Sequence, residues 1–259
     1  MRFTVLDVGH GFCAYLIADN GNLMLFDCGH KTDPVVRPSD HLHNLGQRSV
    51  ERLVITNFDE DHISDLPNVQ TKVRARILVR NNTISSAQLR NLKRQVGPIT
   101  DAMEILLGMM DEYTHDIAEP PSFPDVNWDY FWNRYIDDFD DTNNISLVTF
   151  LDCRGLRVLI PGDLETAGWR NLLASSAFRE KLRGVDVFIA SHHGREDGYC
   201  EDVFAYCTPD VIVFADGPKK YATQEMVDKY ARHARGITFK GESRYVLTTR
   251  NDGTFSWEP

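Results

Sequence analysis

Short apolar runs separated by turn residues predict a strand-rich N-terminal half. The expected strands are the runs at 3–6, 14–17, 23–26, 53–56 and 75–79. The segment Asp19-Asn20-Gly21-Asn22 joins the second run to the third, and its asparagines and glycine tolerate the positive φ of a tight turn. We therefore expect a hairpin at this point, followed later in the chain by a helix over 86–96.

The C-terminal half repeats this alternation with more helix. Its expected strands are 146–151, 156–160, 185–190 and 211–215, and its expected helices are 164–183 and 224–234. The first two strands form a hairpin, and a second hairpin around Asn251-Asp252-Gly253 is expected to pair 245–249 with 254–257. Strand-rich halves with interleaved helices predict a four-layer αββα sandwich or another mixed α/β fold.

The middle segment, residues 101–141, has a different character. It contains a helical stretch, a proline-rich stretch, an aromatic cluster from Trp128 to Tyr135 and an acidic run at 137–141. We interpret it as an insertion or lid in a single domain that spans 1–259, because it is too short to hold its own core. Packing onto the body is the expected role of the aromatic cluster, and substrate stacking is the alternative.

Composition and charge limit the function. Of the 259 residues, 42% are hydrophobic and 25% charged, as in ordinary globular proteins. No apolar run approaches the roughly 18 residues of a membrane span, and we expect no signal peptide. Five widely spaced cysteines without a CxxC pair favour a reducing cytoplasm. The net charge of −10 argues against a general nucleic-acid coat protein, but not against an enzyme with a local basic patch.

The strongest chemical signal directly follows a predicted strand. The segment 56–62 places Asp59, Asp61 and His62 within four residues, where a loop can direct alternate side chains at one centre. Carboxylates and imidazole together suit zinc, manganese or iron. The alternative is an acidic surface turn with a helix cap.

Two further strand ends carry similar groups. Gly162-Asp163 follows one strand, and the adjacent pair His192-His193 precedes Gly194 after another. Two histidines at a strand end favour metal ligation or acid-base chemistry over a structural role. Three strand ends with Asp and His groups indicate a site at one edge of a sheet.

The order of these motifs resembles the metallo-β-lactamase superfamily, and most closely the hydrolase domain of the ComEC-like DNA-uptake proteins and its stand-alone relatives. The resemblance runs from residue 3 to about residue 215 and also rests on Asp7-Val8-Gly9-His10-Gly11, Phe26-Asp27-Cys28-Gly29 and 143–148. It implies an αββα sandwich with one or two divalent metal ions, zinc or manganese, that activate water. Many members hydrolyse phosphodiesters.

The resemblance also implies a ligand set. Asp61 and His62 would bind one metal, and Asp163 would bridge two. Asp59 would serve the other metal together with one histidine of the pair, of which His192 is slightly favoured over His193 for inward projection. Asp59 or Asp61 would accept the proton of the water, and the unused histidine would stabilise the charged oxygen or protonate the leaving group. The catalytic candidates are therefore Asp59, Asp61 and His193.

This sequence departs from the family pattern at three positions. Asn57 replaces the first histidine of the metal motif, although its carbonyl oxygen remains a weak ligand. Relatives often have a histidine ligand near the C-terminus. The corresponding stretch here, 219–224, contains Thr223 and no histidine. A single metal, or an oxygen-rich pair such as manganese, then fits better than a tight zinc pair. His10 stands where relatives commonly have glutamine, and Asp27 matches a structural position.

Residues 66–100 contain no Asp or Glu but seven Lys and Arg residues. Because arginine binds phosphate bidentately, we expect this segment to hold an anionic substrate. A solvated helix face with charged strand edges is the alternative. The substrate-binding candidates are Arg74, Arg76, Arg80, Arg195, Lys219 and Lys220.

The leading hypothesis is a cytoplasmic, metal-dependent phosphodiesterase or nuclease acting on nucleic acid or a nucleotide, without a membrane partner. The rivals are a binding or regulatory module that has lost turnover, supported by Asn57 and Thr223, and a hydrolase of another ester. A homo-oligomer or an operon-encoded protein partner is also considered.

Overall fold

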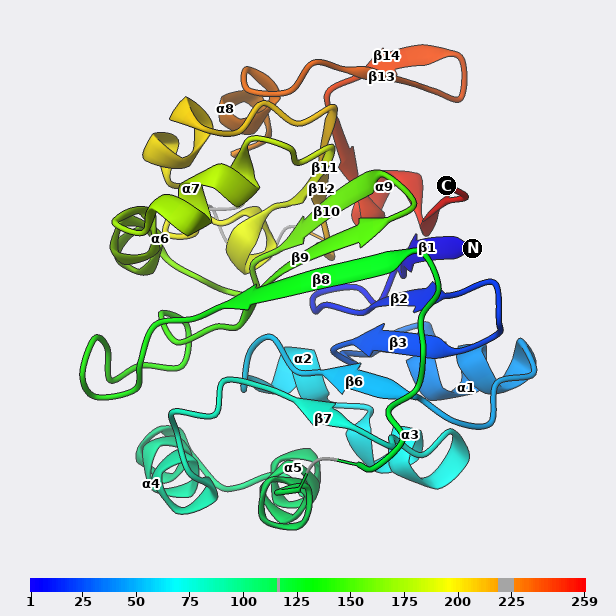
Figure 1. Cartoon of the computed structure of the whole chain (residues 1–259), viewed down its shortest axis with the longest axis vertical. Helices are drawn as coiled ribbons and strands as arrows, with labels where there is room; N and C mark the ends of the chain where they lie inside the picture. The colour runs from blue at the N-terminus through cyan, green and yellow to red at the C-terminus, as the bar shows by residue number, and fades with distance from the viewer. Residues whose placement is uncertain (116, 219–225) are drawn as a thin grey trace.

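Two six-stranded sheets face each other, and helices cover the outer face of each (Figure 1). This computed structural model describes residues 1–115, 117–218 and 226–259. The first sheet has the order β16 (Phe255–Trp257), β1 (Arg2–Val5), β2 (Ala14–Ile17), β3 (Leu23–Phe26), β6 (Arg52–Val54) and β7 (Leu78–Val79). The second has the order β15 (Val246–Thr248), β12 (Val211–Phe214), β11 (Val187–Ile189), β10 (Leu156–Ile160), β9 (Val148–Cys153) and β8 (Val126–Phe131).

The alternation of apolar residues along each strand creates the layers. In β3, Leu23 and Leu25 face the helices, whereas Met24 and Phe26 enter the core between the sheets. Successive strand side chains point to opposite faces, so a fully apolar strand is buried on both. The predicted αββα sandwich is confirmed.

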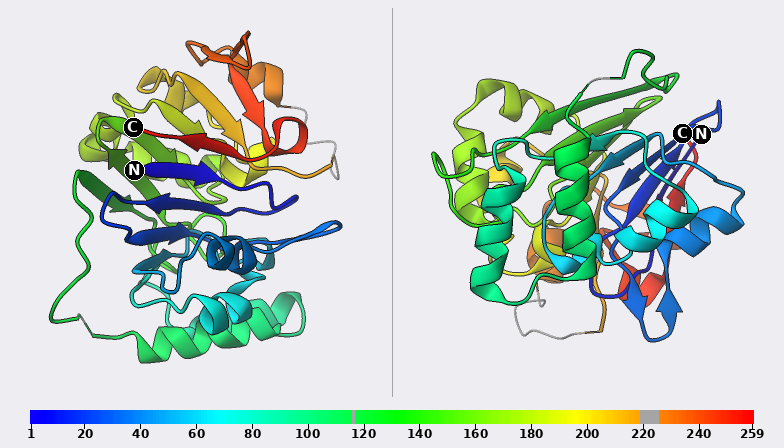
Figure 2. Two further views of the ribbon diagram at one scale, coloured as in Figure 1. Left: turned by 90° about the vertical axis from the view of Figure 1, so that its right-hand side faces the viewer. Right: turned by 90° about the horizontal axis from the view of Figure 1, so that it is seen from below.

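The helices divide between the two outer faces (Figures 1 and 2). The first sheet is covered by α1 (Pro38–Asn44), α2 (Glu60–Ile63), α3 (Leu66–Lys72), α4 (Ser86–Val96) and α5 (Asp101–Glu112). The second is covered by α6 (Thr166–Leu173), α7 (Ser176–Leu182), α8 (Val227–Ala231) and the 3-10 helix η2 (Glu201–Ala205). Within the described ranges, no helix is long and apolar enough to cross a membrane.

Two hairpins lie outside the sheets. The strands β4 (Lys31–Thr32) and β5 (Val35–Val36) form one, which projects from the body in both views of Figure 2. The strands β13 (Ile237–Phe239) and β14 (Glu242–Arg244) form the other.

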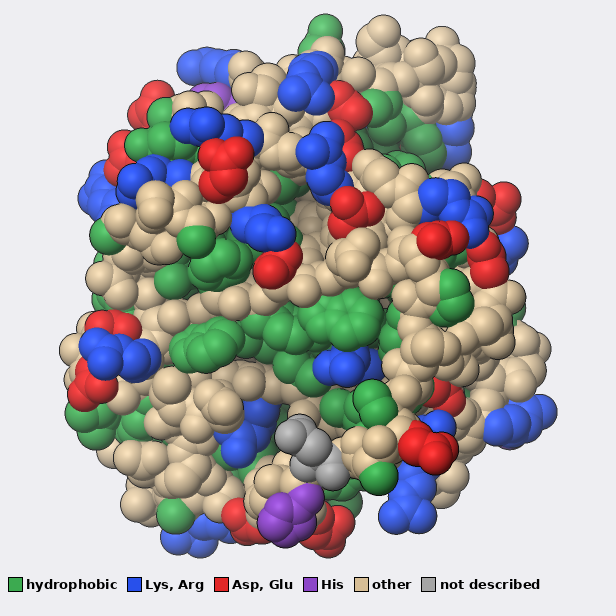
Figure 3. Space-filling model, in the orientation of Figure 1, with side chains coloured by type: hydrophobic (Ala, Val, Ile, Leu, Met, Phe, Trp, Pro, Cys, Tyr) green, Lys and Arg blue, Asp and Glu red, His purple; other side chains and the backbone are tan. Residues whose placement is uncertain are grey.

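The segment 101–141, which the sequence predicts as an insertion or lid, is built into the layers. Helix α5 packs apolar side chains, among them Leu106 and Met110, into the core beneath the first sheet. Strand β8 pairs with β9 as the edge of the second sheet. Apolar side chains gather where β8 crosses the face shown in Figure 3, and Trp128 packs on Phe123 and Arg52. The aromatic cluster therefore has the packing role that was expected.

The predicted C-terminal hairpin is wrong. Strand β15 pairs with β12 in the second sheet, whereas β16 pairs with β1 in the first. Between them, the Thr248 hydroxyl accepts from the Asn251 amide and caps the short helix α9 (Thr249–Asp252). Alternating apolar residues favour a strand equally in either sheet, so the pattern could not reveal this crossing. The expected helix over 164–183 is divided into α6 and α7, because Ser175 caps the second.

Candidate metal centre

Four side chains from three strand ends meet at one edge of the sandwich. They are Asp61 and His62 after β6, Asp163 after β10, and His193 in the 3-10 helix η1 (Ser191–Gly194) after β11. One ligand atom from each lies within 4.8 Å of the others. We call these four residues the tetrad. Strands β10 and β11 are parallel neighbours in the second sheet, so their carboxyl ends lie at the same edge of that sheet. Strand β6 belongs to the first sheet, and the loop after it meets them across the sandwich.

The imidazole of His62 is held between two carboxylates. Its Nδ1 donates to Asp27 Oδ2 at 2.7 Å, and its Nε2 lies 2.9 Å from Asp163 Oδ1. Asp27 is fully buried and also accepts from the amide and hydroxyl of Thr56. A carboxylate on the outer nitrogen fixes the tautomer that presents Nε2 to a metal.

His193 is oriented in the same sense by the backbone. Its Nδ1 donates to the Ala215 carbonyl at 2.9 Å, and its Nε2 lies 3.2 Å from Asp61 Oδ2 and 3.6 Å from Asp163 Oδ2. This buried Nε2 has no hydrogen-bond partner that meets ordinary geometry among the described residues. Two inward Nε2 atoms and two carboxylates fit a zinc, manganese or iron ion.

The charges of the tetrad are strongly coupled. Burial alone would lower the pKa of His193, but the carboxylates of Asp163 and Asp61 outweigh it and raise the pKa to about 10. Burial also opposes the charge on His62, yet Asp163 and Asp27 raise its pKa well above the usual range. Conversely, the two imidazoles hold the pKa values of Asp61 and Asp163 below normal despite burial. The metal-free tetrad thus favours charged imidazoles beside charged carboxylates.

The backbone fixes the loop that carries Asp61. The Asp61 carbonyl accepts from the Phe12 amide at 3.1 Å. A Cβ at Gly29 would lie 1.9 Å from the same carbonyl oxygen, and one at Gly11 would lie 2.6 Å from it. Any side chain at these positions would therefore displace the metal loop. His193 itself has a φ of 55°, a strained value for a residue other than glycine.

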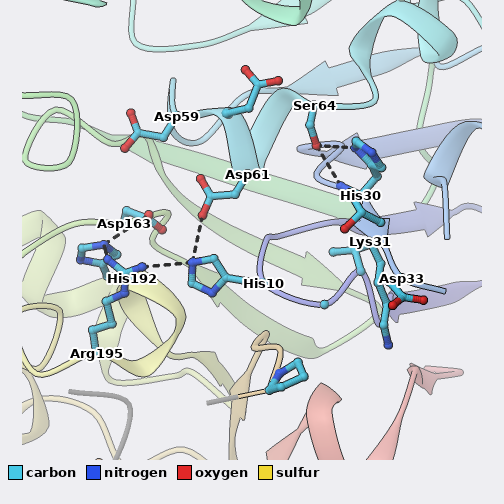
Figure 4. Close-up of a pocket in the computed structure, with 15 residues that line it drawn as sticks. His10, His30, Lys31, Asp33, Asp59, Asp61, Ser64, Asp163, His192 and Arg195 are labelled. Carbon is cyan, nitrogen blue, oxygen red and sulfur yellow. Dashed lines mark hydrogen bonds and ion pairs between the residues drawn. The ribbon is translucent and has the colours of Figure 1, made fainter. Parts of the chain in front are cut away.

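Asp61 and Asp163 of the tetrad line a groove with a volume of about 850 Å³, and the buried His62 and His193 lie behind them. Figure 4 shows Asp61, Asp163, His10, His192 and Arg195 grouped on one side, with Ser64, His30, Lys31 and Asp33 opposite. The opposite wall includes the first strand of the projecting β4–β5 hairpin. The volume lies within the ~300–1,000 Å³ range of ligand sites.

Arg195 links two histidines beside the tetrad. Its guanidinium contacts His192 Nε2 and His10 Nε2, each at 3.0 Å. His10 Nε2 also lies 3.6 Å from Asp61 Oδ2, so His10 faces the site. On the far side of His192, Nδ1 is 2.9 Å from Asp197. His193 therefore projects into the tetrad, whereas His192 forms with Glu165 and Asp197 a second group whose possible ligand atoms lie within 4.8 Å of one another.

Asn57 and Asp59 are not members of the tetrad. The side-chain nitrogen of Asn57 donates to the Thr142 backbone carbonyl and to Ser146 Oγ. The side-chain oxygen of Asn57 accepts from the backbone amide of Asp59. The Asp59 carboxylate pairs with Lys93 and accepts from the Thr142 hydroxyl at 2.9 Å. Asp59 still lines the groove, whereas Asn57 is fully buried. The structure therefore gives Asn57 a role in bracing loops.

Arg74 and Arg76 lie away from the groove, which corrects their prediction as substrate-binding residues. They line a separate depression with Arg48 and Tyr113. The Arg76 amide donates to the Val50 carbonyl before β6, whereas the metal loop follows β6, so the two regions lie at opposite ends of this strand.

The other basic candidates have different outcomes. The Arg80 guanidinium donates to the carbonyls of Asn81 and Ile84 and braces a loop, which also corrects its predicted role. Arg195 lines the groove as expected. Lys219 and Lys220, and the position of Thr223, lie outside the described residues. Within the segment 66–100, Lys72, Arg90 and Lys93 pair with carboxylates, so it forms no continuous basic track in the described structure.

Several groove and support residues were missed or undervalued. The family resemblance assigns Asp27 a structural position. Its hydrogen bond to His62 shows that it also orients a residue of the metal centre. His30, Lys31 and Ser64 carried no motif, and the Ala215 carbonyl has no sequence signal at all. A polar cluster after the third strand, His30-Lys31-Thr32-Asp33, was the available hint.

Comparisons with known proteins agree on the fold. Residues 13–99 match the family model of the metallo-beta-lactamase superfamily. CmlA, a diiron β-hydroxylase from Streptomyces venezuelae, is similar at 12% identity with a TM-score of 0.55; the match covers 99% of this chain and 54% of CmlA. The chain thus spans about half the length of CmlA. A diphosphatase of the PhnP family is similar at 12% identity with a TM-score of 0.50, covering 100% and 98%. No curated protein matches the sequence.

Proposed function

We propose that this chain, which carries a metallo-β-lactamase superfamily domain, is a metal-dependent hydrolase of phosphate esters. The observation that carries the proposal is the tetrad itself, in which two imidazoles present Nε2 to two carboxylates at the side of a large groove. The outer nitrogen of each imidazole is already bonded, to Asp27 or to the Ala215 carbonyl. This arrangement is typical of histidine ligands prepared for a metal.

The metal would lower the pKa of a water molecule and polarise a phosphoryl oxygen. Around it, Arg195 is placed to hold a second phosphoryl oxygen, because its guanidinium enters the groove between His10 and His192. The Nε2 atoms of His192 and His10 accept from Arg195 in this structure, so either histidine would become a candidate to protonate the leaving group once Arg195 turns to the phosphate and its Nε2 takes up a proton. Asp59 lines the groove two residues from Asp61 and is the candidate to accept a proton from water. Lys93 and Thr142 hold its carboxylate in place.

A phosphodiester in a nucleotide or nucleic acid remains the first substrate to test. The groove is large enough for a nucleotide, and Arg195 suits phosphate. A long strand has less support, since Arg74 and Arg76 lie elsewhere. The diphosphatase with the same fold shows that this architecture carries phosphate chemistry in another protein.

One observation favours a second candidate, a binding or regulatory module without turnover. Asn57 and Asp59 occupy positions that the family uses for metal ligands, yet both engage neighbouring protein groups. If turnover needs two metal ions, the chain would bind its ligand without cleaving it.

Elemental analysis of protein purified without added metal or chelator tests the site. We expect about one equivalent of a transition metal in the wild type and none in Asp61→Ala or Asp163→Ala. Asp129→Ala, on the exposed edge strand β8, is the control and should retain the metal. No metal in the wild type, even after excess zinc or manganese, would overturn the hydrolase proposal.

Hydrolysis of bis(p-nitrophenyl) phosphate, nucleotides and single-stranded DNA by the loaded protein then tests turnover. Arg195→Ala should raise KM by about tenfold, the value of one lost charge-assisted hydrogen bond. Arg74→Ala is the matched control and should not change KM. A loaded protein that binds these phosphates without cleaving them would favour the binding module.

A further inference from the structure

A second cleft adjoins the metal groove. It has a volume of about 410 Å³ and lies between the end of α4, the start of α5 and the turn at 140–142. Helices α4 and α5 run side by side in Figure 2. The apolar side chains that line the cleft are Phe58, Leu92, Val96, Pro98, Ile99 and Met103.

The cleft shares part of its lining with the metal groove. Asp59 and Glu60 line both, and Asp61 of the tetrad is the next residue along the chain. A molecule whose reacting group lies at the tetrad could therefore extend past Asp59 into the cleft without crossing the protein body.

The cleft presents apolar surface to solvent on an otherwise polar helix. Val96 is 88% exposed, although α4 is mainly polar. The base of the cleft is well packed, because Phe58 and Met103 are buried and Leu92 and Ile99 pack against the hydrophobic core. Concave apolar surface of this kind is typical of ligand sites.

The charged side chains at the rim of the cleft favour an uncharged ligand group over a negatively charged one. Asp59, Glu60, Asp140 and Asp141 contribute carboxylates, and Lys93 is the basic residue of the lining, already paired with Asp59. A second phosphate in the cleft would meet this negative rim, whereas an uncharged group would not.

We propose that this cleft binds an uncharged apolar arm, an alkyl or aryl ester group, of a substrate whose phosphoryl group lies at the tetrad. The assignment rests on the proposed hydrolase function and narrows its substrate class. The preferred substrate is a phosphate ester with one apolar substituent, and a polynucleotide, with charge at every unit, is disfavoured.

Alkylphosphonates of increasing chain length, from methyl to hexyl, test the cleft without requiring turnover. Calorimetry on the metal-loaded full chain should show affinity rising by about threefold to fourfold for each methylene that is buried. Val96→Asp and Ile99→Asp should flatten this dependence while leaving the affinity for methylphosphonate unchanged. Leu45→Asp, which also replaces an exposed aliphatic side chain by an acid but lies outside the cleft, is the matched control and should preserve the dependence.

The outcomes separate the two proposals. If methylphosphonate fails to bind the loaded protein, the hydrolase proposal fails, and the cleft assignment that depends on it fails too. If methylphosphonate binds and hexylphosphonate binds no tighter, the cleft assignment alone is overturned. A wild-type dimer that Val96→Asp dissociates, with no chain-length dependence, would instead assign the cleft to a second copy of the chain and overturn the subsite.

Discussion

The loop after β6 has two sides that differ sharply although they are only a few residues apart. On one side, Asp61 and His62 join Asp163 and His193, and their ligand atoms face one another around a common centre. On the other, Asn57 and Asp59 have their polar atoms engaged by residues from 93 and 142–146. The tetrad thus gathers its ligand atoms around one candidate metal position, whereas Asn57 and the Oδ1 atom of Asp59 are held by hydrogen bonds and an ion pair to neighbouring segments.

The largest expected effect is the difference in metal affinity between the variants His193→Ala and His192→Ala. His193→Ala removes a tetrad ligand and should weaken metal affinity by more than the ~100-fold that outer residues contribute. His192→Ala should keep the metal and lower kcat, because His192 faces Arg195 in the groove. Metal titration and steady-state kinetics on both variants provide the measurement, and loss of metal in His192→Ala with retention in His193→Ala would contradict this geometry.

Asp27→Asn should weaken metal affinity by about 10–100-fold with the fold intact. The carboxylate orients His62 without touching the metal position, so the effect should be smaller than that of removing a ligand. A zinc competition titration measures it, with circular dichroism to check folding. Unchanged affinity would show that the contact with Asp163 suffices to orient His62.

The metal-free protein should lose stability at high pH. The pKa of His193 is raised in the folded state to about 10, from an ordinary ~6.5. Its contribution to stability is therefore fully present below about pH 6.5 and is lost as the pH rises through about 10. In chelator, Tm should fall by several degrees between pH 7 and pH 10, and saturating zinc should reduce this fall. A flat profile in chelator would show that the tetrad is not protonated as described.

The smallest effect on the metal is expected at Asn57. Asn57→Ala should leave the metal content unchanged and destabilise the fold by about 1–3 kcal/mol, because buried partners lose hydrogen bonds. Denaturant unfolding and elemental analysis of the same sample test this. Lost metal with unchanged stability would return Asn57 to the ligand set.

Local patterns predicted the elements that one short segment can specify. The hairpin of β2 and β3, the helix α4 and the strands that precede the tetrad follow the pattern of apolar residues and turns. The pattern failed where the outcome depends on distant partners. Strands β15 and β16 are both short runs next to one turn, but β15 pairs with β12 and β16 pairs with β1.

The sequence by itself determined that Asp and His groups follow several strands, and parallel strands bring such groups to one edge. It could not determine which groups meet. His192 and His193 both have left-handed φ values, 51° and 55°, so neither strand nor helix periodicity predicts where their rings point. Likewise, Asn57 is satisfied by Ser146, 89 positions away, and Arg76 is carried to the far end of β6. Side-chain direction and long-range pairing are properties of the packed chain, and only the tertiary structure decided them.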